Sequence, residues 1–311
     1  MNSFKYTLDN KRYHTFNYYL KTTYNCKVAK VILDAHLTCP NIDGTKGKGG
    51  CTYCSNMGSG DSNLCSSSSI LEQYNINKAV MDNKWPNSLY IPYFQSHSNT
   101  YTSLDNLKVM LNPFINKEEV AQISLATRCD CLTDEIITYL NELTSIKPIW
   151  LEIGLQTSKD ETEKYLNKCY TFNEFKETIN KLSKTNIKVC IHIIDGLPFE
   201  SEDDMLKTII DINHLPFHAI KIHMLHIIKG TKMEDIYNKE HFHLLTRDEY
   251  IDIVVKQLEL LDENIIIERI TSDPISDKLV EPKWLTNKTT ILNDIDKLMV
   301  KKDTYQGKLF K

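Results

Sequence analysis

The chain has 311 residues, of which 41% are hydrophobic and 25% are charged, and its formal net charge is −4. This composition excludes a disordered, collagenous or coiled-coil protein, and the length allows one large or two small globular domains. No apolar run approaches the roughly 18–20 residues that span a bilayer, and the first residues carry no visible secretory signal, so no membrane partner is expected.

Short apolar segments alternate with amphipathic ones along most of the chain. Strands are predicted near residues 30–35, 88–94, 120–126, 148–153, 187–194 and 218–225. Helices are predicted near residues 70–84, 103–113, 133–143, 173–184, 201–213 and 246–263. This alternation is typical of βαβ units with a parallel sheet. Six units predict an α/β partial (β/α)6 barrel of the TIM type, with its chemistry at the carboxyl ends of the strands.

The domain boundaries follow from these elements. The barrel core is expected over residues 30–263, with an N-terminal extension at 1–29 and a C-terminal extension at 264–311 that packs on the core. The helix at 201–213 is the most firmly predicted, because Ser201 and Asp204 are spaced to form a start similar to a capping box.

Polar residues recur near the carboxyl ends of the predicted strands, where a packed barrel would carry branched apolar residues. They are Asp34, Gln95, Ser124, Glu152, Cys190, His192, Lys221 and His223. A buried charge is costly unless it is paired or solvated, so several together predict a polar cavity inside the sheet. For any single one, an exposed edge position or a satisfied core histidine is the alternative.

A cysteine-rich loop, TCPNIDGTKGKGGCTYC at 38–54, directly follows the first predicted strand. Cys39 is separated by eleven residues from Cys51, and Cys51 and Cys54 form a Cys-x2-Cys pair. Nine cysteines, an odd number in a chain too long to depend on disulfides, favour a reducing cytoplasm with some thiols used for metal binding or catalysis.

Two metal centres fit these three thiols, and unliganded structural cysteines are a third interpretation. Structural zinc takes four closed ligands, for which Cys65 or His36 would be the fourth. A [4Fe–4S] cluster held by three cysteines leaves one iron open. The open iron can chelate the amino and carboxylate groups of S-adenosylmethionine.

This arrangement resembles the radical S-adenosylmethionine (radical SAM) superfamily, in a branch where an eleven-residue gap replaces the commoner three. The resemblance is closest to the YhcC/YtqA-like branch, a relative of the catalytic subunit of Elongator. It runs through most of the chain and includes FNYYLK at 16–21, YFQSHSNTY at 93–101, TRCDCL at 127–132, LEIGLQT at 151–157, HIIDGLPFESEDDM at 192–205, IKIHMLHIIKGT at 220–231 and ERITSDP at 268–274. The chain departs from the family pattern at His36-Leu37, usually Gly-Phe, and at Cys129, usually Pro.

The resemblance implies roles for individual residues. Cys39, Cys51 and Cys54 would ligate the [4Fe–4S] cluster. The residues expected around S-adenosylmethionine are Tyr53, Gln95, Ser124, Arg128, Glu152, Gln156 and His192. Lys221 and His223 would face the substrate as catalytic residues. Cys129 and Cys131 are expected to be structural rather than ligands of a second cluster, and Cys26, Cys65, Cys169 and Cys190 are expected to be buried small side chains.

The implied activity is reductive cleavage of S-adenosylmethionine to a 5′-deoxyadenosyl radical. The relation to Elongator indicates tRNA as the partner and the wobble uridine as the target, with maturation of an aminomethyl side chain there. A reductase or a flavodoxin- or ferredoxin-type protein would donate the electron. Because the sequence ends at Lys311, the acetyl-CoA-using domain of Elongator is not expected. The alternatives are a radical enzyme acting on a small metabolite and a non-enzymatic iron–sulfur or zinc-binding protein.

The charge distribution bears on the tRNA partner. Residues 1–30 carry a net charge of +5 and residues 278–311 a net charge of +4. If the two ends meet, they form a basic rim that would attract phosphates. The alternative is ordinary surface lysine.

Overall fold

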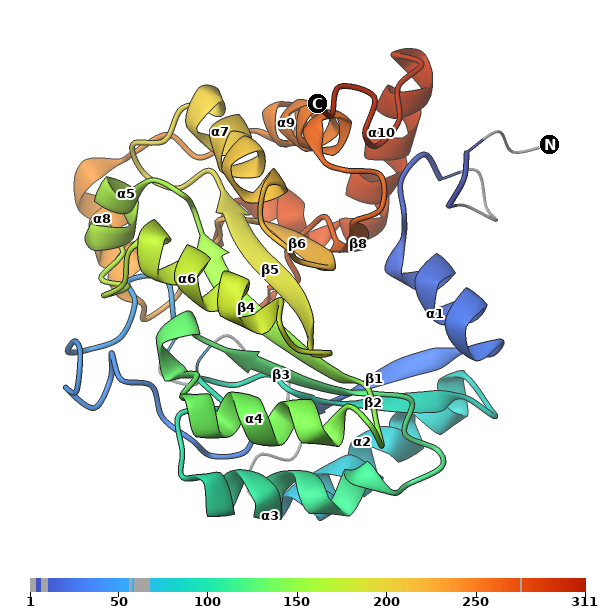
Figure 1. The fold of residues 1–311 in the computed structure, drawn as a ribbon. Helices are drawn as coiled ribbons and strands as arrows, with labels where there is room; N and C mark the ends of the chain where they lie inside the picture. Colours follow the sequence, from blue (N-terminus) through green and yellow to red (C-terminus); the bar gives the residue numbers. More distant parts are fainter. Residues whose placement is uncertain (1–3, 7–10, 56–57, 59–67, 275) are drawn as a thin grey trace.

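The computed structural model describes residues 4–6, 11–55, 58, 68–274 and 276–311. Its central element is a parallel seven-stranded sheet with the strand order β1-β2-β3-β4-β5-β6-β8. The strands are β1 (Val28–Leu33), β2 (Leu89–Phe94), β3 (Ile123–Thr127), β4 (Ile149–Gln156), β5 (Lys188–Asp195), β6 (Ala219–Met224) and β8 (Ile266–Arg269). The sheet curls into a half-barrel (Figure 1). Strands β7 (Ile227–Ile228) and β9 (Leu279–Glu281) form a separate antiparallel pair.

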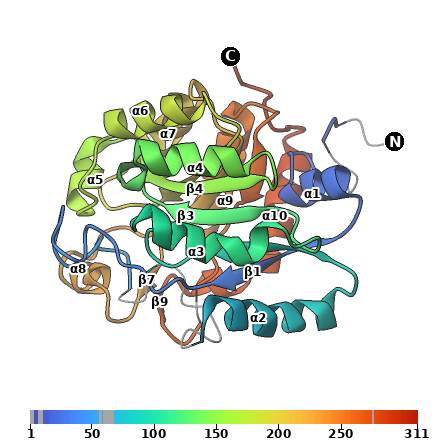
Figure 2. The same cartoon turned by 60° about the horizontal axis from the view of Figure 1, so that its bottom comes forward.

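Helices cover the outer face of the half-barrel (Figures 1 and 2). The predicted helices correspond to α2 (Ile70–Lys84), α3 (Leu104–Ile115), α4 (Asp134–Leu143), α6 (Phe172–Leu182), α7 (Glu202–Asn213) and α9 (Arg247–Leu260). The additional helical segments are α1 (Phe16–Tyr24), α5 (Asp160–Tyr165), α8 (Lys232–Glu240), α10 (Lys288–Lys301) and the 3₁₀ turns η1 (Cys129–Cys131) and η2 (Lys283–Thr286). Capping boxes start α2, α6, α7 and α9, which explains why the sequence defined these helices well.

The predicted partial barrel is confirmed, but its sheet has one strand more than expected. Strand β8 falls in the segment that the sequence analysis assigned to a C-terminal extension, and it pairs with β6. It was missed because it has four residues and only two of them, Ile266 and Ile267, are buried. Residues 264–311 therefore contribute directly to the central sheet.

Helix α1 closes the amino-terminal end of the half-barrel. Its residues Phe16 and Tyr19 pack against the buried Trp150, with ring centroids 6.1 and 5.6 Å apart. A bridge between Thr15 and Ile267 anchors the start of this helix to β8. The bottom of the barrel is thus filled by aromatic side chains, and open space is left at the opposite end.

The two ends of the chain lie side by side. The Nε2 of Gln306 donates to the carbonyl oxygens of Asp262 and Ile265, and its Oε1 accepts a 2.8 Å hydrogen bond from the backbone N–H of His14. Several of the basic side chains there are paired with carboxylates: Lys5–Glu263, Lys11–Asp296, Arg12–Asp303, Lys288–Asp273, Lys297–Asp294 and Lys302–Asp252. These ion pairs lower the net positive charge that the predicted basic rim can present to phosphate groups, because each carboxylate offsets one basic side chain.

None of the helices in the described part of the chain is long and apolar enough to cross a membrane.

The start of α7 supplies a test of the fold. Ser201 Oγ accepts from the Asp204 N–H at 3.3 Å, and Asp204 Oδ2 accepts from the Ser201 N–H at 2.9 Å. We expect Ser201→Ala to lower the free energy of unfolding by about 1 kcal/mol, measured by urea denaturation. Ser183→Ala, at the exposed end of α6, is the control and should change it by less than about 0.5 kcal/mol. Equal effects of the two substitutions would contradict this interpretation of the cap.

Candidate functional site

A cavity of about 270 Å³ lies at the carboxyl ends of the strands. It is bounded by the loop that follows β1, by the ends of β2 to β6, and by the segment after β8. Eleven of the twelve residues predicted for the site line it: Cys39, Cys51, Tyr53, Cys54, Gln95, Arg128, Glu152, Gln156, His192, Lys221 and His223. The structure therefore brings eleven of the predicted residues together around one cavity, and their membership of a functional site and their roles remain predictions.

Ser124 is the exception. It is buried in β3 at 1% exposure and does not line the cavity, whereas Ala126, two residues further along the same face, does. Ser124 lies one step too deep in the barrel, because alternation fixes the face of a side chain but not its height.

The cysteine loop is held in place by Asn41, a fully buried residue. Its Nδ2 donates to the carbonyl oxygens of Asn167 at 2.6 Å and Lys168 at 3.0 Å, and it lies 3.4 Å from Cys51 Sγ. In addition, the Nδ2 of Asn167 donates to the carbonyl oxygen of Gly50, in the cysteine loop, at 2.8 Å. The loop is thus fixed to a segment more than 100 residues away in sequence.

The environment of the cysteines suits metal coordination. A hydrogen bond from Cys54, followed by the charges of Arg128 and Lys168, outweighs burial and lowers the pKa of Cys51 to about 6. The same contact and burial raise the pKa of Cys54, so that the pair readily holds one thiolate. Ser98 Oγ donates to Cys39 Sγ at 3.6 Å.

Among the residues that the structure describes, no three His, Cys, Asp or Glu side chains are arranged to hold a single metal ion. A [4Fe–4S] cluster differs from a single ion in that each of its thiolate ligands binds a different iron atom.

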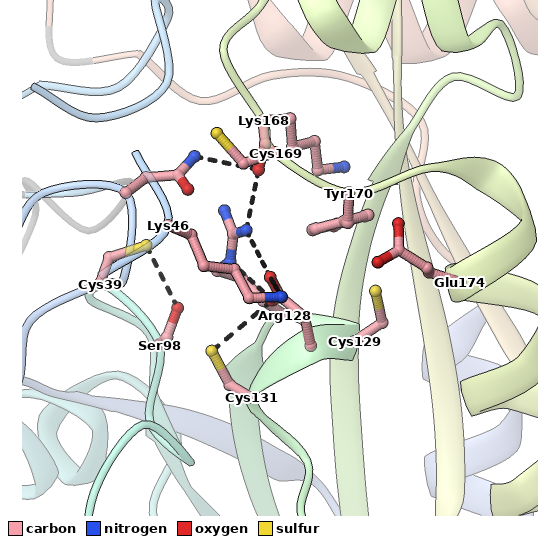
Figure 3. Close-up of polar contacts among 12 residues, drawn as sticks. Cys39, Lys46, Ser98, Arg128, Cys129, Cys131, Lys168, Cys169, Tyr170 and Glu174 are labelled. Carbon is pink, nitrogen blue, oxygen red and sulfur yellow. Dashed lines mark hydrogen bonds and ion pairs between the residues drawn. The ribbon is translucent and has the colours of Figure 1, made fainter. Parts of the chain in front are cut away.

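Arg128 lies beside the cysteines and is held by fixed acceptors (Figure 3). It makes a bidentate ion pair with Asp130, at 2.9 and 2.8 Å, and donates to the carbonyl oxygen of Lys168 at 2.8 Å. Lys46, from the cysteine loop, binds the same Asp130 at 3.0 Å. Burial would raise the pKa of Asp130, but the hydrogen bonds and charge of Arg128 keep it below its usual range. The network ties the cysteine loop to the end of β3.

The floor of the cavity is a buried network of charges inside the half-barrel. Lys30 of β1 pairs with Glu152 of β4 at 2.6 Å and also with Glu268 of β8. Lys221 of β6 pairs with the same two glutamates, with Glu268 at 3.1 Å. Three of the four side chains are at most 5% exposed, and Lys30 is 22% exposed. Two cations balance two anions, which is what makes burial of all four tolerable.

His192 completes this network from β5. Burial and the charge of Lys221 lower its pKa, so the ring is neutral and its Nε2–H is assigned as the donor to Glu152 Oε2 at 3.0 Å. Burial, followed by His192, Arg269 and Lys221, also holds the pKa of His223 well below its usual range. This wall of the cavity therefore carries neutral histidines.

A bulge in β4 shapes the neighbouring wall. The register shifts between Gly154 and Gln156, and Gln156 adopts a left-handed backbone with φ 71°. A Cβ on Gly154 would lie 2.7 Å from Gln156 Nε2, so a larger residue there would displace the amide of this flexible side chain. The carbonyl oxygen of Gly154 accepts from Tyr170 and from Lys168, the latter at 2.9 Å.

The remaining cysteines follow the predictions in part. Cys190, Cys129 and Cys131 are buried, and burial raises the pKa of Cys129 to about 12. Cys169 is exposed, so its prediction as a buried side chain was wrong: it follows Asn167 in a turn with positive φ at both residues. Cys26 is half-buried, and Cys65 lies outside the described residues.

Sequence reasoning missed Lys30 and Glu268. Lys30 was counted with the basic N-terminal segment. Its spacing of two residues from Ile32 already placed both side chains on the same face of β1. Glu268 lay within the quoted segment ERITSDP, but no strand was predicted there. The available signal for a strand was the spacing of two residues between Ile266 and Glu268, which puts both side chains on one face.

Comparison with known families identifies the class of protein. The Radical SAM superfamily model matches residues 43–212, and the radical SAM C-terminal domain model matches residues 217–301. The chain therefore belongs to the radical SAM superfamily, whose members bind a [4Fe–4S] cluster and S-adenosylmethionine.

Individual relatives indicate the branch of the superfamily to which the chain is similar. YtqA of Bacillus subtilis is 40% identical over 99% of this chain and 96% of its own length, and YhcC of Escherichia coli K12 is 29% identical over 90% of both. The fold is similar to the Elp3 structure from the archaeon Methanocaldococcus infernus, with a TM-score of 0.66 at 15% identity. That match covers 90% of this chain, which spans 64% of the Elp3 chain. The resemblance to a YhcC/YtqA-like branch related to Elongator is confirmed.

Two more distant relatives from Methanocaldococcus jannaschii match about half of the chain. One is named a tRNA uridine(34) acetyltransferase and is 20% identical over 43% of this chain and 25% of its own length. The other is named for a threonylcarbamoyladenosine tRNA methylthiotransferase activity and is 27% identical over 51% of this chain and 38% of its own.

The buried charges make stability sensitive to loss of one partner. We expect Glu268→Gln to lower the free energy of unfolding by about 3–5 kcal/mol, because it leaves an uncompensated buried lysine. The double substitution Lys30→Met/Glu268→Gln restores charge balance and should recover most of this loss. Urea denaturation of the three proteins measures both effects, and a double variant as unstable as the single one would refute the role of charge balance.

The same network predicts acid sensitivity. Burial would raise the pKa values of Glu152 and Glu268, but the fields of Lys221 and Lys30 lower both. In the unfolded chain these two carboxylates are protonated near pH 4.3, and in the folded chain only at lower pH. The free energy of unfolding therefore has their full contribution above about pH 4.3 and loses it as the pH falls toward their lower pKa values in the folded protein. In Lys30→Met/Glu268→Gln the free energy of unfolding should fall less steeply between about pH 5 and 3 than in the wild type. If it falls equally steeply in both proteins, the network does not cause the acid sensitivity.

Proposed function

We propose that this radical SAM enzyme matures the aminomethyl side chain on the wobble uridine of tRNA by removing a carboxymethyl group from its nitrogen. The CH2 of that group would lose a hydrogen atom to the 5′-deoxyadenosyl radical, an electron to the cluster and a proton, and water would then cleave the C–N bond and release the two carbons as an oxoacid. The observation that carries the enzyme class is the convergence of three thiols and a balanced polar floor on one cavity at the carboxyl ends of the strands. Support for tRNA comes from the relatives named for tRNA uridine(34) and tRNA methylthiotransferase activities. A cytoplasmic location remains a prediction, as does an electron donor of the flavodoxin, ferredoxin or reductase kind.

Cys39, Cys51 and Cys54 would hold the cluster. Asn41 orients this loop through its contact with Cys51, and Arg128 and Lys168 supply positive charge beside the thiolates. When bound and reduced, the cluster and S-adenosylmethionine supply a radical that abstracts hydrogen from an unactivated C–H bond.

The rest of the cavity binds and shields the reacting molecules. Tyr53, Gln95, Arg128, Glu152, Gln156 and His192 are the proposed contacts of S-adenosylmethionine, while Lys221 and His223 are proposed to face the substrate. Lys221 is fixed by Glu152, Glu268 and Tyr93, so it serves as a positioned charge rather than a mobile base. Met224, Leu225 and Ile228 line the same wall and exclude water.

A small-metabolite substrate is the second candidate. It is favoured by the pairing of several terminal basic side chains with carboxylates, which offsets part of the charge that an RNA-binding rim would need. Filter binding separates the two candidates, because tRNA binding should weaken steeply with salt and a metabolite enzyme should not retain bulk tRNA.

The cluster assignment has a direct test. Alanine substitution of Cys39, Cys51 or Cys54 should abolish the brown colour after anaerobic reconstitution and the 5′-deoxyadenosine formed from S-adenosylmethionine. Cys26→Ala and Cys169→Ala are matched controls and should retain iron content and cleavage. A fully active variant at any of the first three positions would overturn the assignment.

The substrate is tested by mass spectrometry of tRNA nucleosides from cells with and without this protein. We expect carboxymethylaminomethyl uridine to accumulate at the wobble position when the protein is absent, and the wild-type gene but not its Cys54→Ala form to reverse this. Unchanged wobble uridines would rule out the tRNA proposal.

A further inference from the structure

Four cationic side chains line the cavity, and three of them are saturated by fixed protein acceptors. Arg128 is bound by both oxygens of Asp130 and a carbonyl oxygen. Lys168 donates to the carbonyl oxygens of Gly154 and Leu155. Lys221 is held by two glutamates. These three stabilise the site and have little capacity left for a ligand.

Arg269 is different. It ends β8 opposite Lys221 in the sheet register, and its side chain is 33% exposed. Its nearest carboxylate in the described part of the chain is that of Asp273, at 3.9 Å, beyond the range of a direct hydrogen bond. Asp273 is itself bound by Lys288 at 3.0 Å, so it compensates Arg269 only weakly.

The described residues around Arg269 offset its charge only weakly. Glu152 and Glu268 are neutralised by Lys30 and Lys221, and the adjacent His223 is uncharged. A guanidinium presents donors in a planar fork that matches a carboxylate or phosphate through two parallel hydrogen bonds. This part of the cavity is therefore built for an anion.

We propose that Arg269 binds the carboxylate of the substrate and thereby selects substrates that carry one. This inference rests on the proposed function, in which the wobble side chain bears a carboxymethyl group. Two other anions have the same chemistry: an RNA phosphate and the carboxylate of S-adenosylmethionine. The substrate side chain is favoured because Arg269 lies in the cavity wall beside Lys221. Lys221 is the residue proposed to face the substrate, and it lies opposite Arg269 in the register of β6 and β8.

The test compares Arg269→Gln and Arg269→Lys with the control Lys297→Gln, which removes an exposed cation of α10 that lies outside the cavity lining and pairs with Asp294 instead of Asp273. On tRNA bearing carboxymethylaminomethyl uridine, Arg269→Gln should lower kcat/KM about 10- to 100-fold, mainly through KM, and Arg269→Lys should lie between it and the wild type. The control should remain within about twofold of the wild type. Without tRNA, formation of 5′-deoxyadenosine by the holoenzyme should be unchanged in all three variants.

Each alternative anion has its own signature. If 5′-deoxyadenosine formation without tRNA falls with Arg269→Gln, the residue serves the cofactor and the proposal is overturned. If filter binding weakens equally for tRNAs with and without the carboxylate, and the salt slope drops by about one, the partner is a backbone phosphate and the proposal is again overturned. An unchanged kcat/KM also overturns it.

A final measurement separates failure of this inference from failure of the proposed function. If wild-type enzyme converts no tRNA, the proposed function fails, but the anion site is still tested by soaking holoenzyme crystals with malonate. A bidentate malonate on Arg269 in the wild type, absent from Arg269→Gln, supports a carboxylate site for another substrate. No malonate at Arg269 overturns it.

Discussion

The structure depends on the paired charges that connect the two edges of the half-barrel. Lys30 lies on β1 and Glu268 on β8, which are the first and last strands of the sheet, and their ion pair spans the side where no strand completes the barrel. Glu152 and Lys221 link this pair to β4 and β6. Strands that share no backbone hydrogen bonds are thus held at a fixed separation by side chains. The balance of charge lets the interior be polar without being unstable.

This arrangement divides the barrel into two levels. Below the charges, α1 fills the interior with aromatic side chains packed on Trp150. Above them, neutral histidines and the cysteine loop surround the cavity. The charged level therefore separates a packed core from a site for polar ligands, which explains why polar residues recur at the ends of the strands.

Much of this could be predicted from sequence, because strong local patterns coincide with the fold. Capped amphipathic helices and apolar strands gave every predicted element, and the cysteine spacing led to the family. What was missed depends on contacts between distant segments. Strand β8 has four residues and only a weak sequence signal, so its pairing with β6 reveals it. Lys30 shares a strand face with Ile32, but its partners decide that this face is internal. The exposure of Cys169 follows from a turn. The two ends of the chain meet in space, which the sequence left open, and the pairing of their basic side chains with carboxylates could not be deduced from net charge.

The seam between β1 and β8 is closed by side chains and not by strand pairing. The ion pair of Lys30 and Glu268 crosses it, α1 packs beside it, and Arg269 and Asp273 line the cavity next to it. Because these two strands share no backbone hydrogen bonds, this side of the barrel can change its width through side-chain movements that leave the sheet intact.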